Sequence, residues 1–445
     1  MKVENKKVTV LGAARSGIAV AKLLTQNKAH VFVSDSGTPD KENMGLLKKL
    51  HINFETAGHS DRAFDAACAV LSPGIPVASN IVQGFFKRNI PVYSEVEAAF
   101  WFNKSMIIGV TGSNGKTTTT TLIGEILKEA DSQTIVAGNI GQPFSEYVNE
   151  SGEEHWAVIE LSSFQLETID QFKPNIAVVL NFAPNHLDRY DSYDDYLKAK
   201  WRITKNMKQK DLLIYNKDDK KLSAWAQNLD VRKHSFSLSS INESGAGYDG
   251  KSLFLFGEKV IDVEEMNLRG VHNYMNAMAA ILAARAVRVN ESNIVKVLRE
   301  FQGVEHRLEK VAEIHEVLYV NDSKATTVES LMFALQSFNH PIVLIAGGKD
   351  KGSDFSRLND LIKKHVKALV LIGTAAQVMK NEWEQIKPLQ LAESMEDAVR
   401  KATILSEKKD VVLLSPACAS FDMFKDYEDR GRQFKKSVYR LKESI

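Results

Sequence analysis

The sequence predicts an α/β protein of three domains, each built around a mainly parallel sheet. Short apolar segments alternate along the chain with stretches of helical periodicity, as in strand–helix–strand units. Glycine, proline and serine bound these segments. The 445 residues correspond to about three domains at roughly 150 residues each. We expect domains at residues 1–103, 104–303 and 304–445.

The first predicted domain is a small Rossmann-like unit. Its expected strands are residues 8–11, 31–33, 69–71 and 91–93, with a turn over 12–17 and a helix over 18–24. The turn from Gly12 to Gly17, with Asp35 after the second strand, imitates a dinucleotide-binding fingerprint. Ala14 replaces its middle glycine, which disfavours close approach of a pyrophosphate. A different nucleotide-like group is therefore the better expectation for this turn.

The most informative segment opens the second predicted domain. The apolar strand 106–110 runs into a glycine-rich turn and then a helical pattern. Glycines let backbone amides converge on phosphate oxygens, and a helix N-terminus attracts anions. Lys116 supplies a charge and Thr117 a magnesium ligand. An ordinary βα turn explains neither Lys116 nor the threonine run, so we predict an ATP site formed by Gly112, Ser113, Asn114, Gly115, Lys116, Thr117 and Thr118.

The rest of this domain should complete a parallel sheet and add a smaller β-rich part. Strands are expected at 156–160, 176–180 and 212–215, a β-rich stretch at 230–268 and a helix at 273–286. Glu160 ends a strand beside the phosphate loop, where magnesium is commonly held. Its alternative role is that of a surface acid.

Three other features of this domain keep simpler interpretations open. His186 lies in a loop, where a lone histidine is more often structural. Asn273 and Asn276 share a helix face, but Asn273 can also cap that helix. Residues 194–203, which include Lys198 and Lys200, read as a helix with a solvated basic face.

The third predicted domain repeats the α/β pattern from Val304 onward. Its strands are expected at 318–320, 342–345, 369–372 and 411–414. The polar segments 321–326, 347–352 and 415–424 directly follow strands, where open α/β sheets bind ligands; His306 and Arg307 precede them. Cys418 has no arguable acid–base partner, so we expect a buried small residue there.

Composition excludes several classes of protein. Lysine and arginine number 57 against 56 acidic residues, a net charge of +1, so nothing favours nucleic acid or an anionic membrane. The two cysteines form neither a disulfide framework nor a metal motif. We find no signal peptide and no apolar run long enough for a membrane helix. The expectation is a soluble cytoplasmic protein acting as a monomer on small molecules.

Taken together, the motifs resemble the Mur ligases, which form amide bonds with ATP during peptidoglycan assembly. The resemblance spans nearly the whole chain and follows the family's order. Its segments are residues 111–118, Glu160 to Gln165, Asn185 to Asp188, His272 to Ala277, Glu305 to Arg307 and Asn321 to Thr326. Residues 347–355 and 415–424 are similar to those of members that add D-glutamate.

The resemblance implies a mechanism and an assignment of residues. The carboxylate of UDP-N-acetylmuramoyl-L-alanine would take the γ-phosphoryl of ATP, and the D-glutamate amine would then displace phosphate from the acyl phosphate. Two magnesium ions are implied, with Thr117, Glu160, His186 and a carbamylated Lys200 as ligands. The implied catalytic residues are Lys116, Glu160, His186 and Lys200. Further ATP contacts are Asn273, Arg307 and Asp322.

Both substrates have implied sites as well. The uridine-diphosphate substrate would contact Ser16, Asp35, Ser72, Asn139 and His186, and D-glutamate would contact Thr326, Lys351, Ser420 and Phe424. Another Mur ligase is one alternative function, and three further classes of protein are others. A folylpolyglutamate-synthase-like ligase should lack the N-terminal α/β domain, and a nicotinamide dehydrogenase leaves Lys116 without a role. A non-catalytic nucleotide-binding module would release no phosphate.

Overall fold

The computed structural model is an α/β protein with three sheets, which confirms the predicted fold class. It describes residues 1–39, 41–139, 141–183, 189–241, 243–268, 270–350 and 352–443. The chain divides into two compact units, Met1–Phe301 and Gln302–Ile445. Within the described residues, no helix is both long and apolar enough to cross a membrane.

The N-terminal sheet of the first unit is parallel, with strand order β3-β2-β1-β4-β5. Helices α1 and α2 cover one face, and α3 with a short 3-10 helix covers part of the other. The elements are β1 (Lys7–Leu11), α1 (Arg15–Gln26), β2 (His30–Ser34), α2 (Lys41–Lys49), β3 (Asn53–Glu55), η1 (Asp61–Phe64), β4 (Cys68–Leu71), α3 (Asn80–Lys87), β5 (Val92–Ser94) and α4 (Glu95–Phe100).

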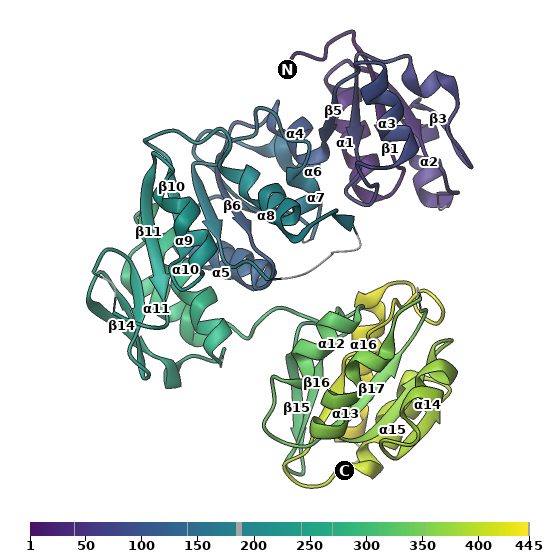
Figure 1. The fold of residues 1–445 in the computed structure, drawn as a ribbon, viewed down its shortest axis with the longest axis vertical. Helices are drawn as coiled ribbons and strands as arrows, with labels where there is room; N and C mark the ends of the chain where they lie inside the picture. Colours follow the sequence, from purple (N-terminus) through teal and green to yellow (C-terminus); the bar gives the residue numbers. More distant parts are fainter. Residues whose placement is uncertain are drawn as a thin grey trace. The chain divides into compact units, whose positions relative to one another are not determined.

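The larger sheet of this unit has the order β14-β13-β12-β11-β10-β9-β6-β8-β7. Strands β6 to β12 pair in parallel, and β12, β13 and β14 form an antiparallel extension. Helices α5 and α10 lie side by side (Figure 1).

The elements of this larger sheet follow in chain order. They are β6 (Met106–Thr111), α5 (Lys116–Glu129), β7 (Thr134–Gly138), α6 (Phe144–Tyr147), η2 (Val148–Glu150), β8 (Trp156–Glu160), α7 (Ser163–Leu166), β9 (Ile176–Val179), α8 (Tyr193–Trp201), η4 (Arg202–Thr204), β10 (Leu212–Asn216), α9 (Lys220–Gln227), β11 (Arg232–Ser237), β12 (Ala246–Tyr248), β13 (Ser252–Leu255), β14 (Glu258–Asp262), η5 (Val263–Glu265), α10 (Val271–Ala286) and α11 (Glu291–Glu300).

Helices α1 and α4 of the N-terminal part pack into the hydrophobic core of the larger sheet. Leu23 of α1 and Val96 and Ala99 of α4 are fully buried with residues of the larger sheet. The Glu97 carboxylate accepts hydrogen bonds from the backbone N–H groups of Asp170, Gln171 and Phe172, and from the Trp101 indole. Apolar burial and this carboxylate together fix α4 against the larger sheet.

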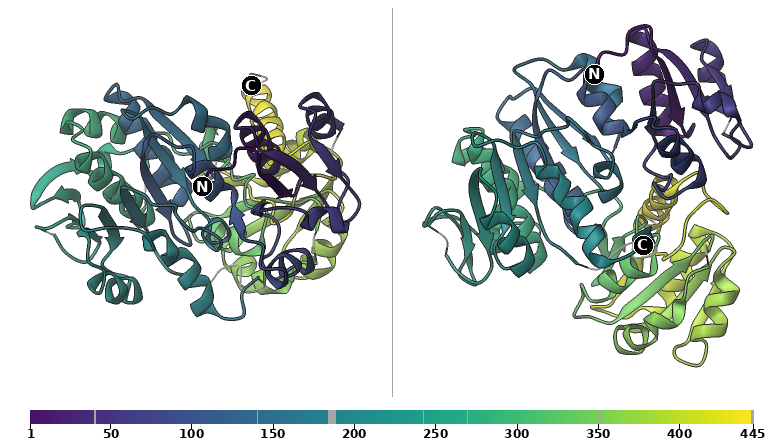
Figure 2. Two further views of the ribbon diagram at one scale, coloured as in Figure 1. Left: turned by 90° about the horizontal axis from the view of Figure 1, so that it is seen from above. Right: turned by 45° about the horizontal axis from the view of Figure 1, so that its top comes forward.

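The second unit contains one sheet with helices on both faces, as Figure 2 also shows. Strand order is β15-β16-β20-β17-β18-β19, and only β15 pairs antiparallel. The elements are β15 (Glu309–Ile314), β16 (Val317–Asn321), α12 (Val328–Leu335), β17 (Ile342–Gly347), η6 (Phe355–Leu358), α13 (Asn359–His365), β18 (Val366–Ile372), α14 (Ala376–Trp383), β19 (Leu389–Ala392), α15 (Met395–Leu405), β20 (Val411–Leu414) and α16 (Tyr427–Glu443).

The predicted strands were found, but the prediction missed β3, β7, β15 and β19. Each of the four lies at an edge of its sheet. Edge strands bury only part of their side chains, so β3, β15 and β19 lack the continuous apolar run that marks a central parallel strand. Strand β7 has a run of only three apolar residues, 135–137. Helix α1 also begins at Arg15, earlier than the predicted Ile18, because its exposed first turn adds no apolar signal.

Candidate functional site

The turn between β6 and α5 has a shape that only glycine allows. Gly112 and Gly115 have φ angles of 152° and 81°. A Cβ atom added at Gly115 would come within 2.2 Å of the Asn276 Oδ1 atom. The turn therefore packs tightly against α10. The first backbone N–H groups of α5 face the open side of the turn, an arrangement suited to binding phosphate oxygens.

Two lysine amines donate hydrogen bonds to the same carbonyl oxygen of this turn, that of Gly112. Lys116 Nζ donates to the carbonyl oxygens of Gly112 and Ser113, both at 2.9 Å, and Lys200 Nζ donates to the Gly112 oxygen at 2.8 Å. Lys200 is only 2% exposed. Burial, reinforced by the nearby Lys116 charge, holds the pKa of Lys200 well below its usual value.

The interpretation of Lys200 as a solvated helix lysine is thus wrong. Lys198 on the same helix α8 fits that description, since it is exposed and pairs with Asp195. Sequence spacing placed the two lysines on different faces but did not show which face is buried.

The Glu160 carboxylate at the end of β8 lies beside the phosphate loop and is 1% exposed, so it is not a surface acid. Thr117 Oγ1 donates to its Oε2 atom and Asn139 Nδ2 to its Oε1 atom, both at 2.7 Å. Two neighbouring ligands of an octahedral magnesium ion, each at about 2.1 Å, lie about 3.0 Å apart. The Thr117 and Glu160 oxygens therefore fit a magnesium site with little movement.

Helix α10 carries the predicted pair of asparagines. Asn276 Nδ2 donates to Asn273 Oδ1 at 3.3 Å, and Thr119 of α5 donates to Asn276 Oδ1 at 3.3 Å. Gly270 occupies the cap position of α10, so the alternative of Asn273 as helix cap is wrong. His186 lies outside the described residues.

A second polar edge lies where β1, β2 and β4 of the N-terminal sheet end. Asp35 accepts hydrogen bonds from the backbone N–H of Ala13 at 2.6 Å and of Gly37 at 2.7 Å. Ser16 is half-buried in the first turn of α1. The Ser72 hydroxyl is buried, with no hydrogen-bond partner among the described residues. Asn139, predicted for the same substrate, instead contacts Glu160 in the larger sheet.

The second unit brings Asp322 and Thr326 to the carboxyl end of β16, and Ser420 and Phe424 to that of β20. Asp322 accepts from the Ser415 hydroxyl at 2.9 Å and from the Leu308 backbone N–H at 3.2 Å. Burial raises the pKa of this carboxyl to about 7, although both hydrogen bonds and the Arg307 charge oppose the shift.

The predicted D-glutamate residues lie in neighbouring loops. The loop of Thr326 is joined to that of Ser420 by a backbone hydrogen bond of 2.8 Å from Ala417 to Ala325. Ser420 is buried and its carbonyl accepts from the Phe424 N–H at 2.9 Å. Lys351 lies outside the described residues. Cys418 is buried as expected, and burial raises its thiol pKa to about 12.

Sequence reasoning missed Arg430 of α16. Its guanidinium is fully buried and donates to the Ser323 hydroxyl, the Ser323 carbonyl and the Cys418 carbonyl at 3.0, 2.7 and 3.0 Å. It joins the loops after β16 and β20. A helical arginine in a polar stretch carries no sequence signal of burial, so only the structure reveals it.

One cluster could be mistaken for a metal centre. Ligand atoms of Glu305, His306 and Glu309 lie within 4.8 Å of one another. Lys435 Nζ lies 3.0 Å from Glu305 and 2.5 Å from Glu309. The lysine pairs with both carboxylates, so the cluster is explained as an ion-pair network.

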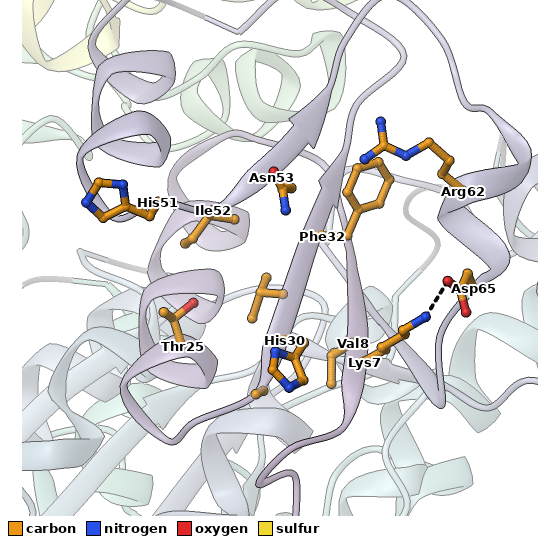
Figure 3. Close-up of a pocket in the computed structure, with 12 residues that line it drawn as sticks. Lys7, Val8, Thr25, His30, Phe32, His51, Ile52, Asn53, Arg62 and Asp65 are labelled. Carbon is orange, nitrogen blue, oxygen red and sulfur yellow. Dashed lines mark hydrogen bonds and ion pairs between the residues drawn. The ribbon is translucent and has the colours of Figure 1, made fainter.

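A surface depression of about 340 Å³ lies in the N-terminal sheet (Figure 3). Lys7, His30 and Asn53, at the amino ends of β1, β2 and β3, help to line it. Asp35 and Ser72 follow the carboxyl ends of strands in this sheet. The depression is therefore separate from the predicted site.

Comparison with known proteins gives the family. Residues 7–81 match the MurD N-terminal domain, residues 110–284 the Mur ligase middle domain, and residues 306–418 the glutamate ligase domain of Mur ligases. The UDP-N-acetylmuramoylalanine–D-glutamate ligase of Salinibacter ruber is 42% identical, covering 99% of both chains. The enzyme of that name from Christiangramia forsetii is 41% identical, covering 98% of this chain and all of its own.

Solved structures agree in fold. The UDP-N-acetylmuramate–alanine ligase of Thermotoga maritima superposes with a TM-score of 0.62 at 19% identity, covering 99% of this chain and 100% of its own. A pseudomurein peptide ligase from Methanothermus fervidus gives a TM-score of 0.58 at 17% identity, covering 98% of this chain and 100% of its own.

Proposed function

Because the chain belongs to the Mur ligase family, we propose that it is an ATP-dependent ligase that adds D-glutamate to UDP-N-acetylmuramoyl-L-alanine. The reaction belongs to peptidoglycan precursor synthesis, which places the protein in the cytoplasm. The observation that supports catalysis best is the hydrogen bond between Thr117 and Glu160 at the mouth of the phosphate loop. We propose the domain limits 1–103, 104–303 and 304–445 and a monomeric enzyme.

Phosphoryl transfer requires positioning and neutralisation of charge more than covalent chemistry by the protein. The amides of residues 112–118 and the Lys116 ammonium would bind the phosphates of ATP. Thr117 and Glu160 would hold one magnesium ion, and His186 a second. Bound magnesium would draw charge from the γ-phosphate. Asn273, Arg307 and Asp322 would contact ATP.

The product amide would form in two steps. The carboxylate of UDP-N-acetylmuramoyl-L-alanine attacks the γ-phosphorus, and ADP leaves. The amine of D-glutamate then attacks the acyl carbon, and phosphate leaves as the amide forms. Ser16, Asp35, Ser72, Asn139 and His186 would contact the first substrate. The D-glutamate site would be Thr326, Lys351, Ser420 and Phe424, with Lys351 facing a carboxylate.

We propose that Lys200 acts as a carbamate. Burial lowers the pKa of Lys200, which favours the neutral amine, the form that adds to carbon dioxide. The nitrogen bonds to the carbon, one proton leaves, and the product is an anionic N-carboxylate. An ammonium repels magnesium, whereas this carboxylate offers oxygen ligands of the kind that magnesium prefers.

Phosphate release tests the function. The enzyme is incubated with ATP, magnesium and UDP-N-acetylmuramoyl-L-alanine, and separately with D-glutamate, L-glutamate, L-alanine or a diamino acid. We expect release with D-glutamate alone. Release with another amino acid and none with D-glutamate would reject the substrate while retaining the ligase class. No release with any of them would favour a non-catalytic nucleotide-binding module, and turnover of a folate substrate would favour a folylpolyglutamate-synthase-like enzyme.

A further inference from the structure

Arg189 connects the two sheets of the first unit at their ligand-bearing edges. Its Nη2 atom donates to the carbonyl oxygens of Pro73 and Ile75, each at 3.0 Å. Arg189 precedes α8 of the larger sheet, whereas Pro73 and Ile75 follow β4 of the N-terminal sheet. The guanidinium thus holds a loop that lies more than a hundred residues away in the sequence.

The loop that Arg189 holds forms part of the N-terminal polar edge. Ile75 N–H closes a turn on the Ser72 carbonyl at 3.1 Å. A Cβ atom added at Gly12 would lie 2.8 Å from the Ser72 hydroxyl and 3.2 Å from Ile75 Cδ1. The loop therefore lies directly on the turn that follows β1. A shift of the loop would displace the buried Ser72 hydroxyl that we assign to the uridine-diphosphate substrate.

On its other side, Arg189 begins a series of stacked rings. Its guanidinium carbon lies 3.7 Å from the centre of the Phe164 ring, in the segment after Glu160. Phe164 stacks on Tyr190 at 6.1 Å, and Tyr190 meets the edge of Tyr196 at 5.4 Å. Such ring contacts are directional and limit how far the guanidinium can move.

The series ends at the phosphate loop. The Tyr196 hydroxyl donates to the Ser113 hydroxyl at 3.0 Å, and the Lys200 amine lies 4.7 Å from the centre of the Tyr196 ring. Burial raises the pKa of Tyr196 to about 12, so the hydroxyl remains a donor. The contacts are continuous from the loop at Ser72 to the loop at Ser113.

We propose that Arg189 is a positioning residue for the uridine-diphosphate substrate, fixing the distance between its nucleotide end and its reacting carboxylate. This inference rests on the proposed function, because that substrate must extend from the N-terminal sheet to the γ-phosphate. The reacting atoms must approach to about 3–3.5 Å, so a small shift of one anchor slows the reaction. Arginine suits the role because its planar fork can bind two carbonyls while stacking on a ring.

The test measures kcat and the KM of each substrate for R189K and R189M. Methionine keeps an apolar stem over Phe164 but has no donor. In R189M we expect kcat to fall, because the reacting carboxylate is displaced, and the KM for the uridine-diphosphate substrate to rise about tenfold or more, as for loss of charged hydrogen bonds. R189K retains a charge and should show a smaller increase. The KM values for ATP and D-glutamate should change less than about twofold, since the sites that we propose for them do not include the Pro73 loop.

Arg202 provides a matched control. It also donates to two carbonyls, those of Leu166 at 2.9 Å and Ile169 at 2.8 Å. Both lie in the connection between β8 and β9 of the larger sheet. R202M should lower the melting temperature without a selective rise in the KM for the uridine-diphosphate substrate. If R189M does not fold, R189K decides the question.

The outcomes separate this inference from the function on which it rests. Wild-type enzyme that releases no phosphate contradicts the proposed function itself. Active wild-type enzyme with unchanged KM values in folded R189M or R189K overturns the positioning role alone. An equal rise in all three KM values, matched by R202M, would assign Arg189 to general stability and also overturn it.

Discussion

Each of the two units buries a basic side chain near its predicted ligand residues. The two side chains differ in how readily they lose their proton. Lys200 in the first unit and Arg430 in the second are 2% and 0% exposed. Within the described residues, neither has a carboxylate within ion-pair distance; both donate instead to loop carbonyls. Burial lowers the pKa of both, that of Arg430 only to about 10.

The chemistry of the two side chains explains why each position has its residue. A lysine that loses its proton becomes a nucleophilic amine, whereas a guanidinium remains charged near neutral pH. Arg430 makes three hydrogen bonds in fixed directions. Among the described residues, Lys200 makes one, to the Gly112 carbonyl that Lys116 also binds. We therefore expect Arg430 to be needed for stability and Lys200 for turnover.

Replacing Lys200 should give the largest effect. K200A removes the proposed carbamate, and we expect kcat to fall by at least about 10²–10³-fold, as for loss of a group that stabilises charge in the transition state. Acetate should restore part of the activity by occupying the vacated space. K200R should remain inactive, because guanidinium does not add carbon dioxide.

Lys198 is the internal control for this experiment. It is exposed on the same helix, and K198A should retain near wild-type turnover. Full activity in K200A, or density for a bare ammonium at high bicarbonate with ATP and magnesium bound, would return Lys200 to a structural role.

Lys116 acts on the same site, because its positive charge helps to lower the pKa of Lys200. K116A should reduce turnover by at least about 10²-fold, since the triphosphate loses a charge partner. The half-buried side chain adds little to packing, so the melting temperature should stay near that of wild type. Phosphate release close to wild type would remove Lys116 from the mechanism.

Methionine substitutions separate stability from chemistry. R430M leaves the carbonyls of Ser323 and Cys418 without this donor and should cost about 2–4 kcal/mol. K200M replaces a buried amine by an apolar side chain of similar length, which should change stability by less than about 1 kcal/mol. A protein of several domains has no single unfolding free energy, so we would measure hydrogen exchange in β6 and β20.

The expected pattern is opposite in the two sheets. R430M should accelerate exchange in β20 and leave β6 protected, while K200M should leave both protected. Faster exchange in β6 of K200M than in β20 of R430M would reverse the assignment.

The smallest expected effects are on how the stability of the folded protein changes with pH, measured without nucleotide. Burial raises the pKa of the Asp322 carboxyl from its usual 3.8 to about 7, so between these two values the folded state binds the extra proton. The contribution of Asp322 to the stability of the folded state is complete below about pH 4 and is lost as the pH rises to 7. This loss is no more than about 1.4 kcal/mol per pH unit. D322N should abolish that decline.

Lys200 gives the opposite sign. Its folded pKa lies below the usual 10.5, so between these two values the unfolded state binds more protons and stability rises with pH. K200M should remove this rise. A rise that persists in K200M would mean that another group carries it.

Central strands and the glycine turn were predictable because they depend on local rules. A buried parallel strand has a continuous apolar run, and the turn at Gly112–Gly115 needs positive φ, which glycine allows. The edge strands β3, β15 and β19 were missed because partial exposure removes that run, and β7 because its run is only three residues long. Glu160 could be placed near the loop since strand ends in one parallel sheet meet at one edge.

The sequence by itself determined the order of α/β units, the phosphate-binding turn and the family to which the motifs belong, since each is written in residues close together along the chain. Only the tertiary structure decided that Lys200 is buried while Lys198 is not, that Arg430 binds two loops, and that Arg189 holds the turn at Pro73. These facts depend on contacts between distant segments, and the resulting loss of solvent sets the pKa of each buried group.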